Sequence, residues 1–206
     1  MSKKLVIVFE GIEGSGKSLH SNNLSKYLKR KKINHIKLRE PGGSKNSEKI
    51  RNLILNNKSN FNKDTDLLLY LAARSENINI LKKFHKKKVI IIDRFTDSTL
   101  AYQHYGLGVN LKLITQINNY ILKDFKVDFT FLNIVNKRNM LVRLQKRKNL
   151  NRYDKFDYAF YSRVQKGFIK LANKNKKKYK IIDSNNDIKL NKAIILEKIN
   201  KLLKWI

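Results

Sequence analysis

The residues best suited to chemistry in this sequence form one short glycine-rich run near its start. The run reads Gly11-Ile12-Glu13-Gly14-Ser15-Gly16-Lys17-Ser18, which fits the pattern G-x-x-x-x-G-K-[S/T]. Glycines at these spacings let successive backbone N–H groups turn inward around phosphates. The lysine that follows can reach the outer phosphates, and the next hydroxyl can bind Mg²⁺. The run therefore predicts a site for the triphosphate of a nucleotide.

This run alone does not identify a reaction. Phosphate loops of this kind occur in small-molecule kinases, in GTPases and in motors that act on nucleic acids. The N-K-x-D pattern that reads guanine is absent from the sequence, which weighs against a GTPase. The second substrate must therefore be inferred from other positions, and an inactive homologue would be expected to lack some of them.

Further polar groups follow the ends of predicted strands. One strand ends in Arg39-Glu40-Pro41-Gly42-Gly43, and another ends in Asp93-Arg94-Phe95 before the run Ser98–Gln103. Tyr70 and Arg74 are one helical turn apart, so their side chains project together. Only ten of the 46 basic residues are arginines. Because a guanidinium can grip a phosphate or the edge of a base with a planar fork, the arginines at these positions are candidates for contact with a second substrate.

The elements that must position these residues alternate along the chain. Short β-branched runs predict strands at Leu5–Phe9, His35–Leu38, Val89–Asp93, Phe129–Val135 and Tyr179–Ile182. Helical patterns cover Lys17–Lys29, Asn46–Leu55, Asp64–Phe84, Leu111–Leu122, Asn139–Arg147, Phe156–Lys174 and Leu190–Leu203. We expect Asp64 or Thr65 to cap the long helix. The alternation predicts an α/β three-layer sandwich with a five-stranded parallel sheet whose strands are buried on both faces.

Size and composition predict one domain over residues 1–206. The chain has 41% apolar residues and no cysteine, which excludes a disulfide scaffold, a thiolate metal site and a cysteine nucleophile. The apolar run Leu5–Phe9 is too short for a secretory signal, and no stretch approaches the ~18 apolar residues of a membrane span. We therefore expect a cytoplasmic protein without a membrane partner.

The formal charge of +30 raises the alternative of a nucleic-acid-binding protein. Its basic residues are dispersed, however, in short runs such as residues 29–32, Lys86–Lys88 and Lys176–Lys178. Such runs are typical of solvated faces. We therefore expect no specific nucleic acid partner, whereas a continuous lysine stripe would favour the alternative.

Together, the glycine-rich run, the R-E-P-G-G string and the Asp93-Arg94 step resemble the bacterial thymidylate kinase (dTMP kinase) family. The resemblance continues along nearly the whole chain, to Asp183. It implies a P-loop kinase, similar to nucleoside monophosphate kinases, that uses ATP and Mg²⁺ to convert dTMP to dTDP on the way to dTTP. It also implies a homodimer packed through helices and a short lid at about residues 143–154, which we call the lid segment.

The resemblance implies a role for each matching residue. ATP binding is implied for Gly11, Glu13, Gly14, Ser15, Gly16, Lys17 and Ser18. Mg²⁺ binding is expected for Ser18 and Asp93. Binding of dTMP is implied for Glu13, Arg39, Pro41, Arg51, Tyr70, Arg74, Arg94, Ser98, Thr99 and Tyr102. Catalysis is implied for Lys17, Arg94 and the lid arginines Arg143, Arg147 and Arg152.

Among the residues that would bind dTMP, Arg94 and Arg51 are expected on the monophosphate. Tyr70 is expected to stack on thymine while Arg74 binds its O4 atom, and Tyr102 is expected to crowd the 2′ position of the sugar. We expect Pro41 to fix a turn, through a cis bond or otherwise. A related kinase with another small acceptor remains the alternative.

Ordinary structural roles compete with several of these assignments. Arg51 could pair with Glu48, Asp93 could cap a helix or turn, and the lid arginines could be solvated. The chain also departs from the family pattern around the lid segment. Gln145 stands where an arginine is usual, and asparagines stand where aspartates are usual, at Asn133 and Asn151.

Overall fold

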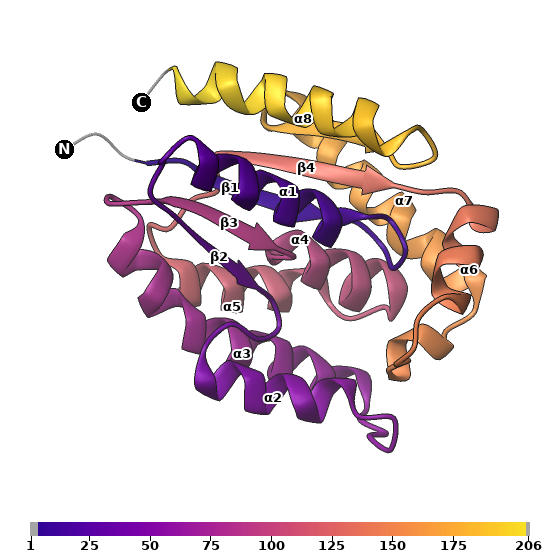
Figure 1. The fold of residues 1–206 in the computed structure, drawn as a ribbon. Helices are drawn as coiled ribbons and strands as arrows, with labels where there is room; N and C mark the ends of the chain where they lie inside the picture. Colours follow the sequence, from indigo (N-terminus) through magenta and orange to yellow (C-terminus); the bar gives the residue numbers. More distant parts are fainter. Residues whose placement is uncertain (1–3, 205–206) are drawn as a thin grey trace.

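Five short strands pair in parallel into one sheet in the computed structural model, which describes residues 4–204 (Figure 1). The strands are β1 (Val6–Glu10), β2 (His35–Arg39), β3 (Val89–Asp93), β4 (Phe129–Ile134) and β5 (Tyr179–Asp183). Their order across the sheet is β2-β3-β1-β4-β5. The predicted α/β fold class is confirmed, although the ends of the predicted domain, residues 1–3 and 205–206, lie outside the described part.

Helices connect the strands, mostly within one or two residues of the predicted bounds. The long ones are α1 (Lys17–Arg30), α2 (Lys45–Leu55), α3 (Lys63–Phe84), α5 (Leu111–Leu122), α6 (Lys137–Gln145), α7 (Tyr158–Lys174) and α8 (Ile188–Leu203). Short turns of helix that the sequence did not predict are α4 (Thr96–Thr99), the π-helix η1 (Leu100–Gly106) and the 3₁₀ helices η2 (Arg152–Lys155) and η3 (Lys176–Lys178).

Side-chain alternation along the central strand β1 creates a core on each face of the sheet. Ile7 and Phe9 pack into a cluster with α1 and α8, whereas Val6 and Val8 pack into a cluster with α3. The same layers are visible in Figure 1, where α1 and α8 cover one face and α3 and α5 the other. The prediction that strands are buried on both faces holds for β1, β3 and β4. It is wrong for β2 and β5, because these two are the outer strands of the sheet and are partly exposed.

Two local predictions are wrong for identifiable reasons. The cap of α3 is Asn62, whose side chain accepts hydrogen bonds from the backbone N–H groups of Asp64 and Thr65. Those two residues therefore belong to the first turn of the helix rather than to its cap. Arg143 and Arg147 do not share one helix, because α6 ends at Gln145. Arg147 lies in the segment beyond it and is free to point elsewhere.

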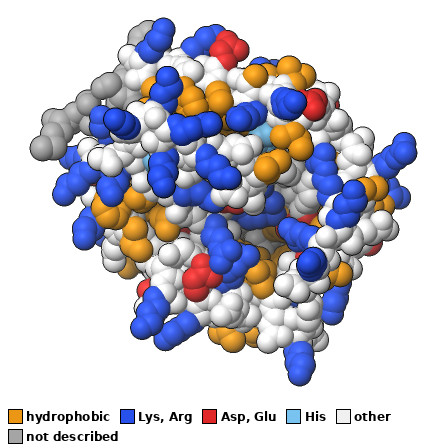
Figure 2. Space-filling model, viewed as in Figure 1, with side chains coloured by type: hydrophobic (Ala, Val, Ile, Leu, Met, Phe, Trp, Pro, Cys, Tyr) orange, Lys and Arg blue, Asp and Glu red, His pale blue; other side chains and the backbone are white. Residues whose placement is uncertain are grey.

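The basic residues are spread over the face of the molecule that Figure 2 shows. Figure 2 shows lysine and arginine side chains dispersed across the visible face, with no single stripe that would follow a polyanion. This pattern is the one expected of solvated lysines rather than of a nucleic-acid-binding face. Within residues 4–204, the structure contains no helix that is both long enough and apolar enough to cross a membrane.

Candidate active site

The glycine-rich run forms the loop between β1 and α1. Gly11 has φ 142°, and a Cβ atom there would lie 2.3 Å from the carbonyl oxygen of Asn133, so only glycine fits this position. Gly16, with φ 79°, directly precedes the first residue of α1. The positive end of α1 and its free N–H groups therefore face the loop, as an anion site requires.

Lys17, the first residue of α1, directly follows the loop, and its side chain is buried. Its Nζ atom donates to the carbonyl oxygen of Ile12 at 3.2 Å. Burial, with the like charge of Arg94 adding to it, lowers the pKa of Lys17 to about 8. Burial has removed water that would stabilise this ammonium. The negative charge of a bound phosphate would therefore stabilise the protonated form of Lys17 strongly.

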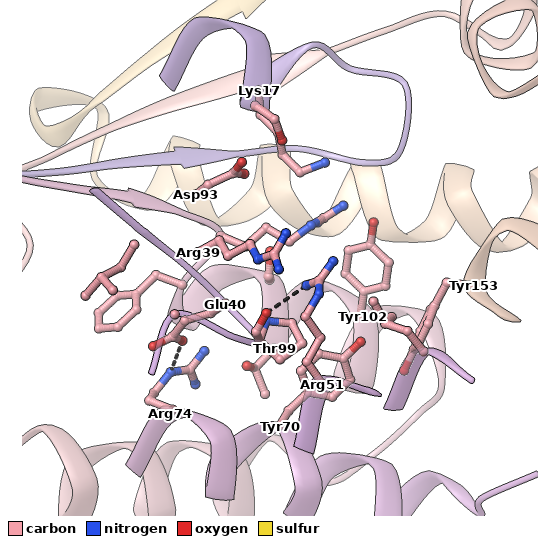
Figure 3. A pocket seen from close by; sticks show the side chains of 18 of the residues that line it. Lys17, Arg39, Glu40, Arg51, Tyr70, Arg74, Asp93, Thr99, Tyr102 and Tyr153 are labelled. Atoms are coloured by element: carbon pink, nitrogen blue, oxygen red, sulfur yellow. Dashed lines mark hydrogen bonds and ion pairs between the residues drawn. The ribbon is translucent and has the colours of Figure 1, made fainter. Parts of the chain in front are cut away.

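A cavity of about 500 Å³ opens beside Lys17 and the carboxyl ends of the strands (Figure 3). Most of the predicted site residues lie on its wall, and they come from α1, α2, α3, the last residues of β2 and β3, the segments that follow β1, β2 and β3, and the segment after α6. The predicted residues on this wall are Glu13, Lys17, Ser18, Arg39, Pro41, Arg51, Tyr70, Arg74, Asp93, Arg94, Ser98, Thr99, Tyr102 and Arg147. Sequence positions up to 134 residues apart, from Glu13 to Arg147, thus meet in one cavity.

Arg94 is held in the cavity through both of its Nη atoms. Its Nη2 atom pairs with Glu13 Oε1 at 2.7 Å, and its Nη1 atom donates to the carbonyl oxygen of Gly11 at 2.9 Å. Burial, the largest single influence, opposes the charge, but Glu13 together with Tyr102, Glu10 and Asp93 outweighs burial and raises the pKa of Arg94. The backbone of Arg94 has φ 69°, a left-handed conformation that costs energy for a residue with a side chain and that occurs at functional sites.

Glu13 connects Arg94 to the aromatic part of the cavity. Besides Arg94, it accepts a hydrogen bond from the hydroxyl of Tyr102. Burial works against ionisation of Glu13, yet the charges of Arg94 and Lys17 outweigh burial and lower its pKa. Glu13 is therefore an anion at neutral pH, and it holds Arg94 ready beside the phosphate loop.

Arg51 faces the cavity and does not pair with Glu48. Its Nη1 atom donates to the carbonyl oxygen of Pro41 at 2.7 Å, and the Glu40–Pro41 peptide bond is cis. Glu48 pairs instead with Arg39 at 2.9 Å, at the exposed rim. The alternative role of Arg51, an ion pair with Glu48, is therefore not observed.

Arg74 lies at the opposite end of the cavity from Lys17 (Figure 3). It is only 2% exposed, its Nε atom pairs with Glu40 at 2.8 Å, and its Nη1 atom donates to Asn118 at 2.7 Å. Its Nη2 atom makes no hydrogen bond to any residue that the structure describes. Burial raises the pKa of Glu40 against the opposing charge of Arg74. A buried guanidinium whose Nη2 N–H groups are still unpaired is suited to donate to a carbonyl oxygen.

Two unsatisfied polar groups lie between these ends. Thr99 Oγ1 and Gln103 Nε2 are buried on the cavity wall and have no hydrogen-bond partner among the described residues. Buried polar atoms are normally paired, so these two are suited to a polar ligand. Ser98 differs, because its hydroxyl is engaged with Glu10 Oε2 at 2.5 Å. Sequence reasoning missed Gln103, since nothing in the run predicted the π-helix that carries it.

Of the three lid arginines, only Arg147 lines the cavity, and it also pairs with Asp154 at 2.6 Å. Arg143 donates to the carbonyl oxygens of Gly14 at 2.8 Å and Ser184 at 2.7 Å. Arg152 is not on the cavity wall. Two further lid-segment residues line the cavity and were missed by sequence reasoning as site residues, Asn151 and the buried Tyr153.

The burial of Glu10 should make the folding stability of the protein depend on pH. Glu10 lies buried behind Arg94, where it accepts a hydrogen bond from the backbone N–H of Phe95 at 2.7 Å. Burial, together with the charge of Asp97, raises the pKa of Glu10 from 4.5 to about 7. The folded protein therefore keeps a proton that the unfolded chain releases between these values. Its free energy of unfolding loses this contribution as pH rises through that window.

Substitution of Glu10 by Gln should remove this dependence. Between about pH 5 and pH 8, the wild-type free energy of unfolding should fall relative to that of E10Q by on the order of 2–3 kcal/mol. Urea unfolding of both proteins at the two pH values measures the difference. Parallel changes in the two proteins would show that Glu10 does not titrate in this way.

The strand order, the phosphate loop after β1 and the arginine-lined cavity beside it define a P-loop kinase of the nucleoside monophosphate type. A sequence model of the family "Thymidylate kinase" matches residues 9–195. The chain belongs to the thymidylate kinase family.

Similar proteins match more than nine-tenths of the chain. The thymidylate kinase of Ruthia magnifica is 37% identical over 191 residues, which cover 91% of this chain and 93% of that protein. The thymidylate kinase of Wolbachia pipientis wMel is 36% identical over 198 residues, covering 93% and 98%. The crystal structure of thymidylate kinase from Ehrlichia chaffeensis superimposes with a TM-score of 0.79 at 33% identity, covering 97% of this chain and 99% of that one.

Proposed function

We propose that this protein transfers the γ-phosphoryl group of ATP to dTMP, giving ADP and dTDP in a step toward dTTP. One observation carries the proposal: Lys17 of the phosphate loop and the arginines Arg51, Arg74 and Arg94 line the same cavity although they come from separate elements. Two anionic nucleotides can therefore meet there end to end.

The phosphate loop is the proposed donor site, with main-chain N–H groups and Lys17 around the β- and γ-phosphates. The Ser18 hydroxyl and the Asp93 carboxylate both line the cavity, and they are the hard oxygen ligands that Mg²⁺ prefers. Within residues 4–204, no three or more His, Cys, Asp or Glu side chains are grouped so that they could hold a metal ion by themselves. Bound Mg²⁺ would neutralise phosphate charge.

The remaining wall of the cavity is the proposed acceptor site. Arg94 and Arg51 would hold the monophosphate near the donor, with Arg39 at the rim. Tyr70 would stack on the base, and Arg74 would use its remaining Nη2 atom on a carbonyl oxygen. Five further residues of the wall are proposed to lie around the base and the sugar or to form the turn beside them: Glu13, Pro41, Ser98, Thr99 and Tyr102.

Little covalent work falls to the side chains in this reaction. The second pKa of a phosphate monoester is about 6, so the acceptor is already an anion at neutral pH and no general base is required. The protein places the two phosphates in line and stabilises the charge that spreads over the transferred group. Lys17, Arg94 and Arg147 are the cations that line the cavity for this purpose. Arg143, bonded to Gly14 and Ser184, would hold the donor loop.

We further propose that the chain is one kinase domain with a mobile lid at residues 143–154, that it is cytoplasmic, and that it acts as a homodimer. Exposed apolar side chains support the dimer: Leu68 on α3 is 57% exposed and Tyr120 on α5 is 77% exposed, and α3 packs against α5. Sedimentation of the wild type and of a Leu68→Lys variant measures the assembly.

A panel of nucleoside monophosphates tests the proposed reaction. With ATP and Mg²⁺, ADP release measured in a coupled assay should be fastest with dTMP, because a base site built from Tyr70 and Arg74 favours a pyrimidine carbonyl. A ribose 2′-hydroxyl should clash near Tyr102. A preference for AMP over dTMP would contradict the proposal.

A further inference from the structure

The lid segment contacts both halves of the cavity. Arg143, at its start, is bonded to Gly14 of the phosphate loop and to Ser184 after β5. Arg152, near its end, reaches in the other direction, to the carbonyl oxygen of Ile54 in the last turn of α2, at 2.5 Å. The proposed donor and acceptor sites are thus connected through one short segment.

Asp66 is the residue on which the acceptor-side end of the lid segment is anchored. It lies in the first turn of α3, is 4% exposed, and pairs through Oδ1 with Nη2 of Arg152. Its Oδ2 atom accepts a hydrogen bond from the hydroxyl of Tyr153 at 3.1 Å. One buried carboxylate therefore holds two successive lid residues. Separation of the buried ion pair between Asp66 and Arg152 is strongly disfavoured, because it would leave a buried charge without its partner.

The anchor fixes an aromatic ring in the acceptor part of the cavity. Tyr153 is 3% exposed, and its ring centroid lies 6.0 Å from that of Tyr70 and 6.0 Å from that of Tyr102, edge to face in both cases. These three tyrosines line the cavity together (Figure 3). We call them the aromatic wall. Tyr70 comes from α3, Tyr102 from η1 and Tyr153 from the lid segment, so the wall is complete only while the lid segment stays in place.

We propose that Asp66 is a positioning residue for the acceptor nucleotide: it holds Arg152 and Tyr153 so that Tyr153 completes the aromatic wall. Arg152 then acts through Asp66 rather than on the transferred phosphate, which replaces the catalytic role predicted for it from the sequence. The inference rests on the proposed function, because it takes the acceptor to bind beside Tyr70 and Tyr102.

Asp66 could instead act only locally, by stabilising the first turn of α3, and Asp64 allows this alternative to be tested. An acidic residue in the first turn of a helix stabilises that helix through its dipole, and Asp64 occupies the same turn. Asp64, however, is exposed, whereas Asp66 is buried against the lid segment. Asp64→Asn is therefore a matched control for Asp66→Asn, since both variants remove one carboxylate charge from the same turn.

Steady-state kinetics with ATP and dTMP distinguish the two roles. In D66N the KM for dTMP should rise about tenfold while the KM for ATP stays within about twofold and kcat within about threefold. D64N should match the wild type in all three constants. A D66N enzyme with the same KM for dTMP as D64N would overturn the proposal.

Substitution of Arg152 separates positioning from catalysis, and it also serves if D66N fails to fold. R152Q should reproduce the raised KM for dTMP, and R152K should restore part of the affinity because it keeps a charge opposite Asp66. A fall in kcat of about 10²-fold or more in R152Q, with KM unchanged, is the loss expected for a transition-state cation. That result would overturn the proposal.

Limited trypsin cleavage tests the anchor without any nucleotide. Lys146 and Lys148 in the lid segment are exposed, and D66N should be cleaved after them about tenfold faster than D64N, because the segment is released more often. Equal cleavage rates would refute the anchor. If the wild type fails to phosphorylate dTMP, the proposed function fails, and these rates still decide whether Asp66 holds the lid segment.

Discussion

Replacing Lys17 with Met is expected to lower kcat by about 10³-fold, the loss typical of removing a preorganised charge from the reacting phosphate. Methionine is unbranched like lysine and only one atom shorter, so it can occupy the same buried space without the charge. The substitution also removes an ammonium that burial already disfavours, so the variant should fold with an unchanged or higher melting temperature. Initial rates at saturating ATP and dTMP, together with a melting curve, measure both effects.

The same lysine sets a limit on the working pH. Because the pKa of Lys17 is lowered to about 8, the free enzyme loses this proton as pH rises through that value. The protonated form binds the phosphates, so kcat/KM for ATP should fall above about pH 8. Lys26→Met, on the exposed side of the same helix, is the control. A K17M enzyme as active as K26M would remove Lys17 from the proposed donor site.

Replacing Arg94 with Lys is expected to lower kcat/KM for dTMP by about 10³-fold, although the charge is kept. The guanidinium contacts Glu13 and the Gly11 carbonyl at the same time, and an ammonium cannot reproduce this planar arrangement. Arg94→Ala should instead lose folding stability, by about 3–5 kcal/mol, because Glu13 would remain buried without its partner.

Comparison of substrates shows where Arg94 acts. Initial rates with dTMP varied at saturating ATP should reveal the loss in R94K, whereas the affinity for ATP, measured by nucleotide titration, should change by less than about threefold. Arg30→Lys, at the exposed end of α1, controls for the type of substitution. An equal loss of affinity for both nucleotides would mean that Arg94 supports the cavity as a whole rather than the acceptor phosphate.

The framework of the fold was predictable because its signals are local. The β-branched run from Val89 to Asp93 forms the buried strand that it predicts. The glycine-rich run forms the phosphate loop, since its glycines occupy positions that exclude other residues, such as Gly11 against Asn133. The arginines at the strand ends reach one cavity because parallel strands end at one edge of a sheet.

The remainder of the site depends on contacts that no local pattern encodes. Asp66 and Arg152 are 86 residues apart, and nothing near either residue indicates that they pair. The π-helix that carries Tyr102 and Gln103 has no 3.6-residue periodicity to predict it. The end of α6 at Gln145 separates Arg143 from Arg147 and gives them different partners, although their spacing suggested a shared helical face.

The two outer strands have a consequence for how the protein behaves in concentrated solution. The outer edges of β2 and β5 offer backbone hydrogen-bonding groups to which a strand from another molecule could add. Each of these strands carries an exposed lysine, Lys37 on β2 and Lys180 on β5. Repulsion between such charges opposes sheet-to-sheet aggregation. Salt that screens these charges should therefore make the protein more prone to aggregate.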